Sequence, residues 1–449
     1  GGMLWGGSHT ANNSTWFQEN ELISSGLNIE WLGDKWKVNA DFGFSEASIT
    51  SRWVNMQSWF WIPEADSEGM NYSWDTTGEK LAIDTAYDIG NVDDYGLSSM
   101  QVDNDRELKD EMFTAKVDLS REVEWGLVED VSFGIRFSDR EKDNDVVSWD
   151  QSVTDISAAV DAHTYSLGSA YDVPAIYSIR NWREVANTAF GGIDNRSDHT
   201  KENGDYLNSW NVEESSFAAY VMFDLIGTLA GVDYTGNVGV RYVTTDSTSS
   251  GYQTTIDGGL SPLSVDHSYS EVLPSLNLRF SVTEASQIRV GLARTMARAP
   301  LIEMRTGYSF STDGTVNTAS GGNPELDPFI ANQLDLGYEY FFADDAALTL
   351  SLFYKDLQSH IGTQTEVVNF DGVDYQFSRP VNGEGGSIRG FEVMYQQAFS
   401  MLPAPFDGLG IYTNYSYTDS NVYEFEPEAT PLSLGGLSER VGSLTFWYY

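Results

Sequence analysis

The sequence predicts an all-β protein, a large antiparallel transmembrane β-barrel with long extracellular loops. Three observations predict this fold class: a period-two alternation of apolar and polar residues, connections that alternate between short and long, and a high aromatic content. The 449 residues include 24 Tyr, 23 Phe and 13 Trp. A membrane barrel places such side chains in two girdles at the membrane–water interfaces.

The alternation recurs along most of the chain. Every second residue of each segment is apolar, and the residues between them are small, polar or charged. Because successive side chains of a strand point to opposite faces, each segment has one apolar and one polar face. A soluble β-sandwich also alternates, but these strands extend to about ten residues or more, the length that crosses a bilayer on a tilt. The clearest segments are 131–137, 238–242, 276–280, 288–292, 334–340 and 348–352.

The connections between the expected strands differ in length. Short turns on one side and long loops on the other are typical of outer-membrane barrels. Short turns are expected at 32–35, 283–286 and 342–346, and long connections at roughly 63–108, 150–212, 251–267, 297–330 and 425–435. The connection 150–212 is the best candidate for a lid or binding surface, with short helices expected at 156–160 and 178–186.

On this interpretation the apolar faces contact lipid and the polar faces line the lumen. Basic and acidic side chains both occur on the polar faces, so they can pair across neighbouring strands or hold an internal domain. Most of them are expected to be scaffold of the lumen wall. The lumen candidates are Lys116, Asp118, Arg136, Asp224, Arg241, Arg279, Arg289, Asp335, Glu339 and Glu392.

The strand count and the chain ends lead to one expectation. About 13 strands are expected, whereas single-chain bacterial barrels have even numbers. Residues 1–5 lack a basic region followed by an apolar core. Residues 444–449 end inside an expected strand. We therefore expect a sequence that is truncated at both ends. No transmembrane helix is expected, because no run of 18 apolar residues occurs.

Composition excludes several function classes. The formal net charge of −42 would repel phosphates, so no nucleic-acid partner is expected. The chain has no cysteine, which excludes disulfides, zinc–thiolate sites and cysteine nucleophiles.

Five segments carry a resemblance to a known family. They are 273–279 (LPSLNLR), 293–300 (ARTMARAP), 322–328 (GNPELDP), 331–339 (ANQLDLGYE) and 353–356 (FYKD). In this order and spacing they resemble the barrel of TonB-dependent outer-membrane receptors, in particular a subgroup found in Caulobacter-like and marine Gram-negative bacteria. Further matches flank them at 138–142, 236–242, 390–392 and 409–417.

The resemblance implies a domain, a location and an activity. Residues 1–449 would form the β-barrel domain of such a receptor, as part of a 22-stranded barrel in the outer membrane. The plug domain and the last strands of the family would be missing. The activity implied is active import of a specific solute, foremost an oligosaccharide, powered by the TonB–ExbB–ExbD complex through the plug. Outer-membrane lipid and lipopolysaccharide are the surroundings implied, and a ferric siderophore or another scarce nutrient is the alternative solute.

Candidate ligand-binding residues are loop tryptophans and two arginines. Trp rings stack on sugar rings or on flat aromatic ligands, and packing within a loop is the alternative role. The tryptophans are Trp74, Trp149, Trp182 and Trp210. Arg298 and Arg305 stand at the start of the connection 297–330, where they can grip an anionic ligand or position the loop.

No catalytic pattern supports an enzyme. The five histidines form no metal-binding pair, and no nucleophile elbow or phosphate loop occurs. Residues 383–386 (GEGG) predict a turn. No cofactor is expected beyond structural calcium at the acidic segments 103–105 and 143–145, which lack the full EF-hand pattern. Two other classes stay open: a passive porin without a plug, and a barrel hydrolase with a constellation of catalytic residues that the sequence does not reveal.

Overall fold

The computed structural model describes most of the chain. The described residues are 2–7, 10–60, 70–78, 81–85, 88, 91, 95–153, 162–165, 176–179, 182–190, 199–255, 259–312, 316–370, 372–423 and 432–449.

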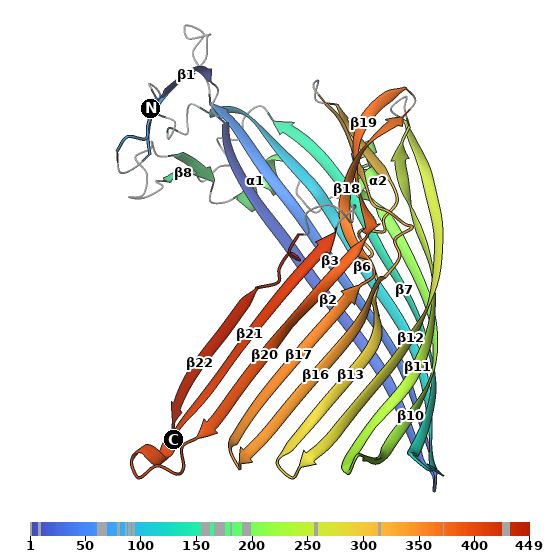
Figure 1. Ribbon diagram of the computed structural model, residues 1–449. Helices are drawn as coiled ribbons and strands as arrows, with labels where there is room; N and C mark the ends of the chain where they lie inside the picture. The colour runs from blue at the N-terminus through green and yellow to red at the C-terminus, as the bar shows by residue number, and fades with distance from the viewer. Residues whose placement is uncertain are drawn as a thin grey trace. The chain divides into compact units, whose positions relative to one another are not determined.

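The main structure is a sheet of 13 strands, which agrees with the number expected from the sequence (Figure 1). Along the sheet the neighbours from β10 to β22 pair antiparallel. In sheet order the strands are β2 (Thr10–Leu32), β3 (Trp36–Phe60), β6 (Tyr95–Trp125), β7 (Val128–Val153), β10 (Trp210–Leu229), β11 (Val232–Thr254), β12 (Leu260–Thr283), β13 (Ser286–Ala297), β16 (Phe329–Ala343), β17 (Ala346–Leu357), β20 (Gly385–Ala398), β21 (Leu409–Tyr423) and β22 (Arg440–Tyr448).

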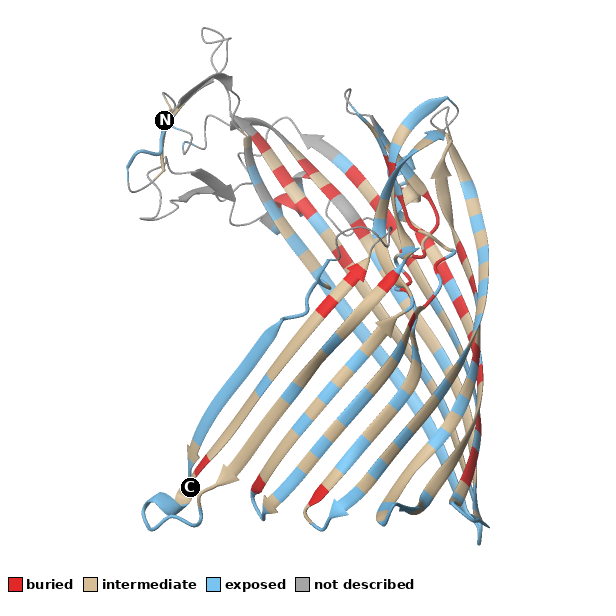
Figure 2. Cartoon of the chain, viewed as in Figure 1, coloured by how far each residue is buried: buried red, intermediate tan, exposed pale blue. Residues whose placement is uncertain are grey.

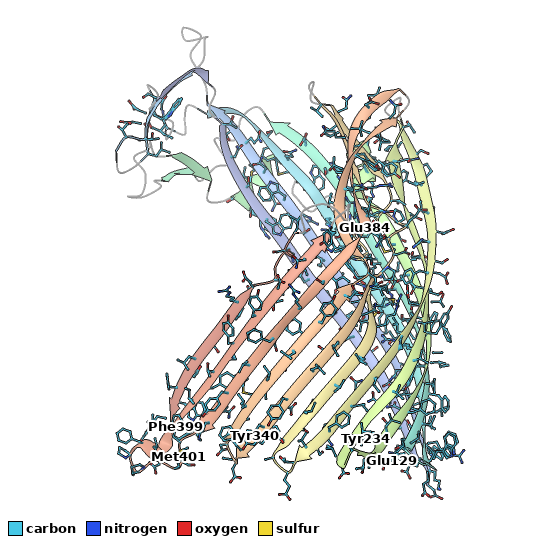
Figure 3. All side chains as sticks on the ribbon, in the orientation of Figure 1. Glu129, Tyr234, Tyr340, Glu384, Phe399 and Met401 are labelled. Carbon is cyan, nitrogen blue, oxygen red and sulfur yellow. The ribbon has the colours of Figure 1, made fainter. Side chains whose placement is uncertain are left out.

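Short turns join consecutive strands at one end of the sheet. The three predicted turns are confirmed between β2 and β3, β12 and β13, and β16 and β17, and two-residue connections also follow β6 and β10. The connection from β20 to β21 includes the 3-10 helix η6 (Phe406–Gly408). Figure 3 labels Glu129, Tyr234, Tyr340 and Phe399 beside these turns, and Glu384 toward the other end of the strands.

Two sequence expectations need correction. The connection 251–267 is not a long loop, because β11 continues to Thr254 and β12 begins at Leu260. The stretch 95–108, expected in a connection, belongs to β6. In both places the backbone pairing of the strand continues where the exposed apolar rows that mark a membrane strand are missing. The apolar residues of this part of β6, Met100 and Val102, are buried.

The predicted helix at 178–186 is partly confirmed. Strand β9 (Ile176–Ile179) precedes helix α1 (Trp182–Ala189). The sequence did not reveal helix α2 (Asn203–Asn208), which carries a capping box between Glu202 and Asp205. The expected helix at 156–160 lies outside the described residues.

Three smaller sheets complete the described structure. β1 (Gly2–Gly7), β4 (Met70–Asp75) and β5 (Ala82–Thr85) form one, and β8 (Ala162–Tyr165) pairs with β9 in another. The third has the order β14 (Tyr308–Thr312), β15 (Asn317–Gly321), β19 (Val373–Gly383), β18 (His360–Phe370). Within it β15 and β19 are parallel, so the connection that follows β13 joins the β18–β19 hairpin.

The chain divides into two compact units. One comprises Gly1–Leu22, Ala47–Lys109 and Asp143–Ser209, and the other comprises Ile23–Glu46, Asp110–Lys142 and Trp210–Tyr449. Within the described residues, no helix has the length and the apolar character that a membrane crossing requires.

The second unit shows the two faces that the sequence predicts. Many large apolar side chains of its strands are exposed. Figure 2 shows exposed residues alternating with less exposed ones along these strands. Ile135 is 52% exposed, Tyr242 46% and Leu352 46%. A soluble sandwich would bury these side chains in its core, so their exposure favours a surface that contacts lipid. We call this side the apolar face and the opposite side the polar face.

The apolar face ends at a definite level on each strand. The last outward apolar residues are Phe217 on β10, Tyr242 on β11 and Val272 on β12, and polar residues such as Asp246 and Ser270 follow on the same face. The membrane-spanning segments therefore end near these residues, and the rest of each strand extends beyond the bilayer.

Candidate functional site

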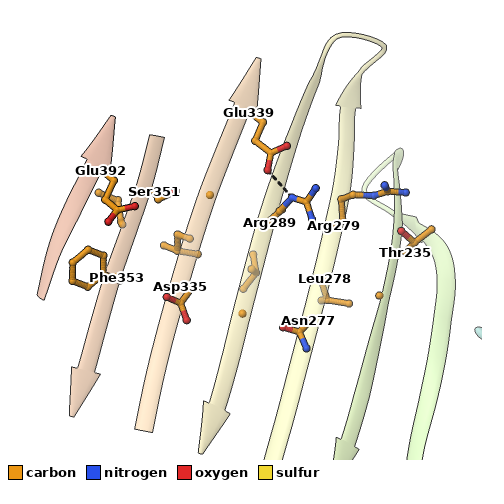
Figure 4. A pocket seen from close by; sticks show the side chains of 16 residues that line it. Thr235, Asn277, Leu278, Arg279, Arg289, Asp335, Glu339, Ser351, Phe353 and Glu392 are labelled. Atoms are coloured by element: carbon orange, nitrogen blue, oxygen red, sulfur yellow. Dashed lines mark hydrogen bonds and ion pairs between the residues drawn. The ribbon is translucent and has the colours of Figure 1, made fainter. Parts of the chain in front are cut away.

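A broad hollow lies on the polar face across six neighbouring strands (Figure 4). Its volume is about 720 Å³. Five of the ten predicted lumen residues line it: Arg279, Arg289, Asp335, Glu339 and Glu392. The structure thus brings together side chains that lie up to 113 residues apart (392 − 279) in the sequence.

Strand register explains how these side chains meet. Arg279 faces Arg289 across the β12–β13 ladder, Arg289 faces Gly337 on β16, and Ser351 faces Glu392 on β20. Gly337 and Gly291 leave space in the hollow, because a side chain at either position would lie beside Arg289 or Asp335. The result is a wide, shallow, polar wall instead of a packed core.

Only some of the charged side chains that line the hollow form ion pairs with one another. Arg289 donates to Glu339 at 2.7 Å, and Gln287 donates to the same carboxylate. Among the described residues, Arg279 has no carboxylate within ion-pair distance. Asp335 and Glu392 likewise make no ion pair there. Most of the wall can therefore hydrogen-bond water or a polar solute.

A second polar cluster lies on the polar face where β6, β7 and β10 meet. Tyr220 of β10 donates to Asp118 of β6 at 2.7 Å, and Lys116 lies 2.5 Å from the same carboxylate. The Tyr220 ring passes over Gly134 of β7, where a Cβ atom would lie 2.2 Å from Tyr220 Cε1. Glycine at position 134 is therefore what lets two strands that are not neighbours connect.

The connection after β13 folds back over the polar face of β10 and β11. We call residues 298–328 the returning segment. Thr306 N donates to Ser249 at 2.9 Å, and Thr254 donates to Tyr308 O at 3.2 Å. At Gly307, with a φ of +101°, a Cβ atom would lie 2.3 Å from Tyr252 O. Backbone and β11 thus meet too closely for a side chain.

The returning segment buries its own apolar residues together with part of the wall. The buried apolar residues are Ala299, Leu301, Met304, Ala319 and Leu326 on the segment, and Val212, Ala218 and Val243 on the strands. The segment is therefore a packed element of the structure.

Arg298 anchors the beginning of the returning segment. Its guanidinium lies 3.4 Å from the Glu214 carboxylate and donates to Ser216 at 2.5 Å. Burial raises the pKa of Glu214, whereas the charges of Arg298 and Arg140 act in the opposite direction. Arg305 is less engaged and donates to Ile302 O within its own segment. Of the two roles predicted for these arginines, the contacts of Arg298 support positioning of the segment; ligand binding stays a prediction.

The GNPELDP motif at 322–328 fastens the returning segment to the β18–β19 hairpin. Asn323 donates to Pro380 O at 3.0 Å. Asp327 N donates to the Asn382 side chain, which in turn donates to Asp327 O, both at 2.9 Å. His267 of β12 also lies 3.0 Å from Asp327. In the sequence this motif was one of the segments that carried the family resemblance. In the structure it acts as a brace, because its hydrogen bonds hold the returning segment against the β18–β19 hairpin.

The four predicted tryptophans have different environments. Trp74 lies on β4 and is 40% exposed. Trp149 is buried on β7 and stacks on His199, with ring centroids 4.4 Å apart. Trp210 is buried at the start of β10. Trp182 begins α1, and its side chain lies outside the described residues. Trp149 and Trp210 thus have local packing roles, and ligand contact by any of the four stays a prediction.

The acidic segments proposed for calcium lie on strands. Asp105 is fully buried and lies 3.0 Å from Arg52, and Asp145 pairs with Lys201. In the described part of the chain, no three acidic or histidine side chains gather in a way that could hold a metal ion. Side chains 103 and 104 lie outside the described residues.

Comparison with known proteins assigns the chain to a class of outer-membrane β-barrels. The model of the TonB-dependent receptor-like β-barrel family matches residues 54–449. The chain belongs to this family, so it is an outer-membrane β-barrel whose polar face lines the lumen. No curated protein sequence matches it.

Three solved structures illustrate the relationship. The ferric citrate transporter FecA in the unliganded form is 10% identical, with a TM-score of 0.45, and the match covers 96% of this chain and 55% of that one. The ferric-catecholate import receptor Fiu from E. coli K12 is 13% identical (TM-score 0.43; 99% and 69% covered). The alcaligin receptor FauA from Bordetella pertussis is 9% identical (TM-score 0.42; 96% and 57% covered). The chain therefore spans a little over half the length of FecA and FauA.

Proposed function

We propose that the chain forms the wall and the extracellular connections of a receptor that actively imports a specific solute across the outer membrane. The observation that carries this proposal is the polar face. It is a wide wall of charged and small residues, shielded from lipid by an apolar face on the same strands. Membership of the TonB-dependent receptor-like family supports an energy supply from the TonB–ExbB–ExbD complex.

Dependence on TonB separates this function from that of a passive porin. Uptake of a labelled solute would be measured in cells that express the full-length protein, with and without a functional TonB. We expect uptake to saturate and to stop without TonB. Uptake that continues down the concentration gradient without TonB would instead identify a porin.

We propose an oligosaccharide as the imported solute. Trp74 supports this class because its exposed ring can stack on a sugar ring. Asn277, Asn237 and Ser351 add neutral hydrogen-bonding groups on the polar face, which suit sugar hydroxyls.

Calorimetric titration of the full-length receptor in detergent would test the solute class, with a panel of oligosaccharides and ferric siderophores. We expect heat from one oligosaccharide class, reduced by Trp74→Ala or Trp182→Ala. Trp125→Ala is the matched control, because Trp125 is 65% exposed at the turn end of β6. Heat from ferric chelates alone would replace the oligosaccharide with a siderophore and keep the receptor.

A further inference from the structure

Two arginines on the lumen wall stand out in an acidic chain. The sequence has 67 acidic and 25 basic residues, so most cations on its surface find a carboxylate nearby. Arg140, Arg289, Arg294 and Arg298 all form ion pairs with acidic side chains. Among the described residues of the polar face, Arg279 of β12, Arg136 of β7 and Arg241 of β11 have no such pair. Arg279 lies in the hollow opposite Arg289, whereas Arg136 and Arg241 lie outside the hollow.

The nearest carboxylates are already engaged. Arg241 faces Tyr220 across the β10–β11 ladder, and Tyr220 donates to Asp118. Asp118 also pairs with Lys116. Glu214 pairs with Arg298, and Arg140 makes a two-pronged contact with Asp110 at 2.8 and 2.7 Å. Among the described residues, none of these carboxylates therefore forms an ion pair with Arg136 or Arg241.

Arg241 lies within electrostatic range of two other cations, Arg136 and Arg298, which repel it. Asp118, with the opposite sign, attracts it but shares its charge with Lys116. Arg241 is half-buried, so water screens this repulsion less than at an open surface.

The β10–β11 ladder places Arg241 opposite Tyr220, and the Tyr220 ring passes over Gly134, two residues before Arg136 on the same face of β7. The two arginines therefore lie near the same tyrosine ring. A bound anion would relieve the repulsion, because guanidinium groups hold carboxylate, sulfate and phosphate oxygens in bidentate geometry.

The position of the pair suits a solute that enters from outside. Arg136 precedes Phe137, and Arg241 precedes Tyr242, on the last outward apolar rows of their strands. The guanidiniums therefore lie on the lumen wall near the outer limit of the membrane-spanning segments. Arg298, at the start of the returning segment, adds positive potential there while it stays paired with Glu214.

We propose that Arg136 and Arg241 form an oxoanion-binding patch that holds a carboxylate, sulfate or phosphate group of the imported solute. The proposal rests on the import function proposed above and narrows its solute to an anionic one. An acidic chain would otherwise repel such a solute, so a local cationic patch is needed for its capture.

Inorganic sulfate tests the patch without knowledge of the solute. The apparent Kd for sulfate would be obtained from the thermal unfolding midpoint of the full-length receptor, with ionic strength held constant by sodium chloride. We expect a saturable stabilisation that Arg241→Gln and Arg136→Gln each weaken by about tenfold or more. Arg389→Gln is the control, because Arg389 already pairs with Asp419 at 2.9 Å. Stabilisation that is absent, or equal in all four proteins, would overturn the proposal.

A matched pair of sugars then locates the anion on the solute. An oligogalacturonate and its methyl ester have the same chain length and differ in charge. We expect only the charged form to bind, and Arg241→Gln to abolish this binding. Equal binding of both forms, unchanged by Arg241→Gln, would overturn the proposal that the solute is anionic. It would still be consistent with import of an oligosaccharide. Sulfate binding at the patch without binding of either sugar would support the oxoanion-binding patch and contradict the proposal that the solute is an oligosaccharide.

Discussion

The two faces of the same strands have opposite relations to their surroundings. On β16, Leu336 and Tyr338 point to the apolar face. Both side chains are exposed, as expected for residues that contact lipid. Their neighbours Asp335 and Glu339 point to the hollow on the polar face. Backbone and register are shared, so only the side chains differ. The apolar face needs only a sequence pattern, whereas the polar face depends on which residues the register brings together.

The largest expected effect breaks this comparison directly. Leu336→Arg places a charge in the middle of the apolar face and should reduce the free energy of unfolding by about 2–4 kcal/mol. Asp335→Ala, on the adjacent residue but on the polar face, should change it by about 0.5 kcal/mol or less. Urea unfolding in lipid vesicles measures both. Equal losses would show that the two faces do not have the assigned environments.

Gly134 sharpens the comparison within the polar face. A Cβ atom there would lie 2.2 Å from Tyr220 Cε1 and 2.4 Å from Asp118 Oδ1. Gly134→Ala should therefore displace the ring, break the Tyr220–Asp118 hydrogen bond and cost about 2 kcal/mol. Gly291→Ala is the matched control, because its nearest neighbours lie 3.6 Å away. The same unfolding measurement should find the control within about 0.5 kcal/mol of the wild type.

Arg298→Gln tests whether the returning segment depends on its anchor. Removing one partner of a buried ion pair costs about 3–5 kcal/mol. Since the Arg298 side chain is 34% exposed, we expect a smaller loss of about 1–2 kcal/mol at neutral pH. Adding Glu214→Gln should restore most of it, because no buried charge then remains. A double variant as unstable as the single one would contradict an electrostatic anchor.

The pH dependence of this loss has a defined sign. Burial raises the pKa of Glu214 above its ordinary value, and removal of Arg298 removes a charge that opposes the rise. A raised carboxyl pKa stabilises the fold below the ordinary value of 4.5 and loses this contribution as pH rises through the folded-state pKa. The difference in stability between Arg298→Gln and wild type should therefore shrink as pH falls toward 4.5. A difference that is independent of pH would exclude Glu214 as its source.

The sequence predicted features that repeat and missed features that depend on distant partners. The alternation predicted the apolar face, the number of strands and three turns, because the period of two is a local property. The burial of Trp149 on β7 was not predictable, since its stacking partner His199 lies far along the connection between β7 and β10. Likewise, the pairing of Arg298 with Glu214 depends on the course of the returning segment. The outer parts of β11 and β12 resembled a loop for a different reason, since their outward face carries polar residues such as Asp246 and Ser270 in place of an apolar row.

The smallest expected effect compares the part of the polar face that the returning segment covers with the open part around the hollow. Asn382 holds the returning segment through two hydrogen bonds with Asp327, so Asn382→Ala should cost about 1 kcal/mol. Amide hydrogen exchange should accelerate in residues 322–328 and leave the strands around the hollow unchanged. Asn369→Ala is the control, because Asn369 pairs with Asp374 inside the same hairpin. Acceleration that spreads to β13 and β16 would mean that the brace also stabilises the wall, and that the two parts of the polar face unfold together.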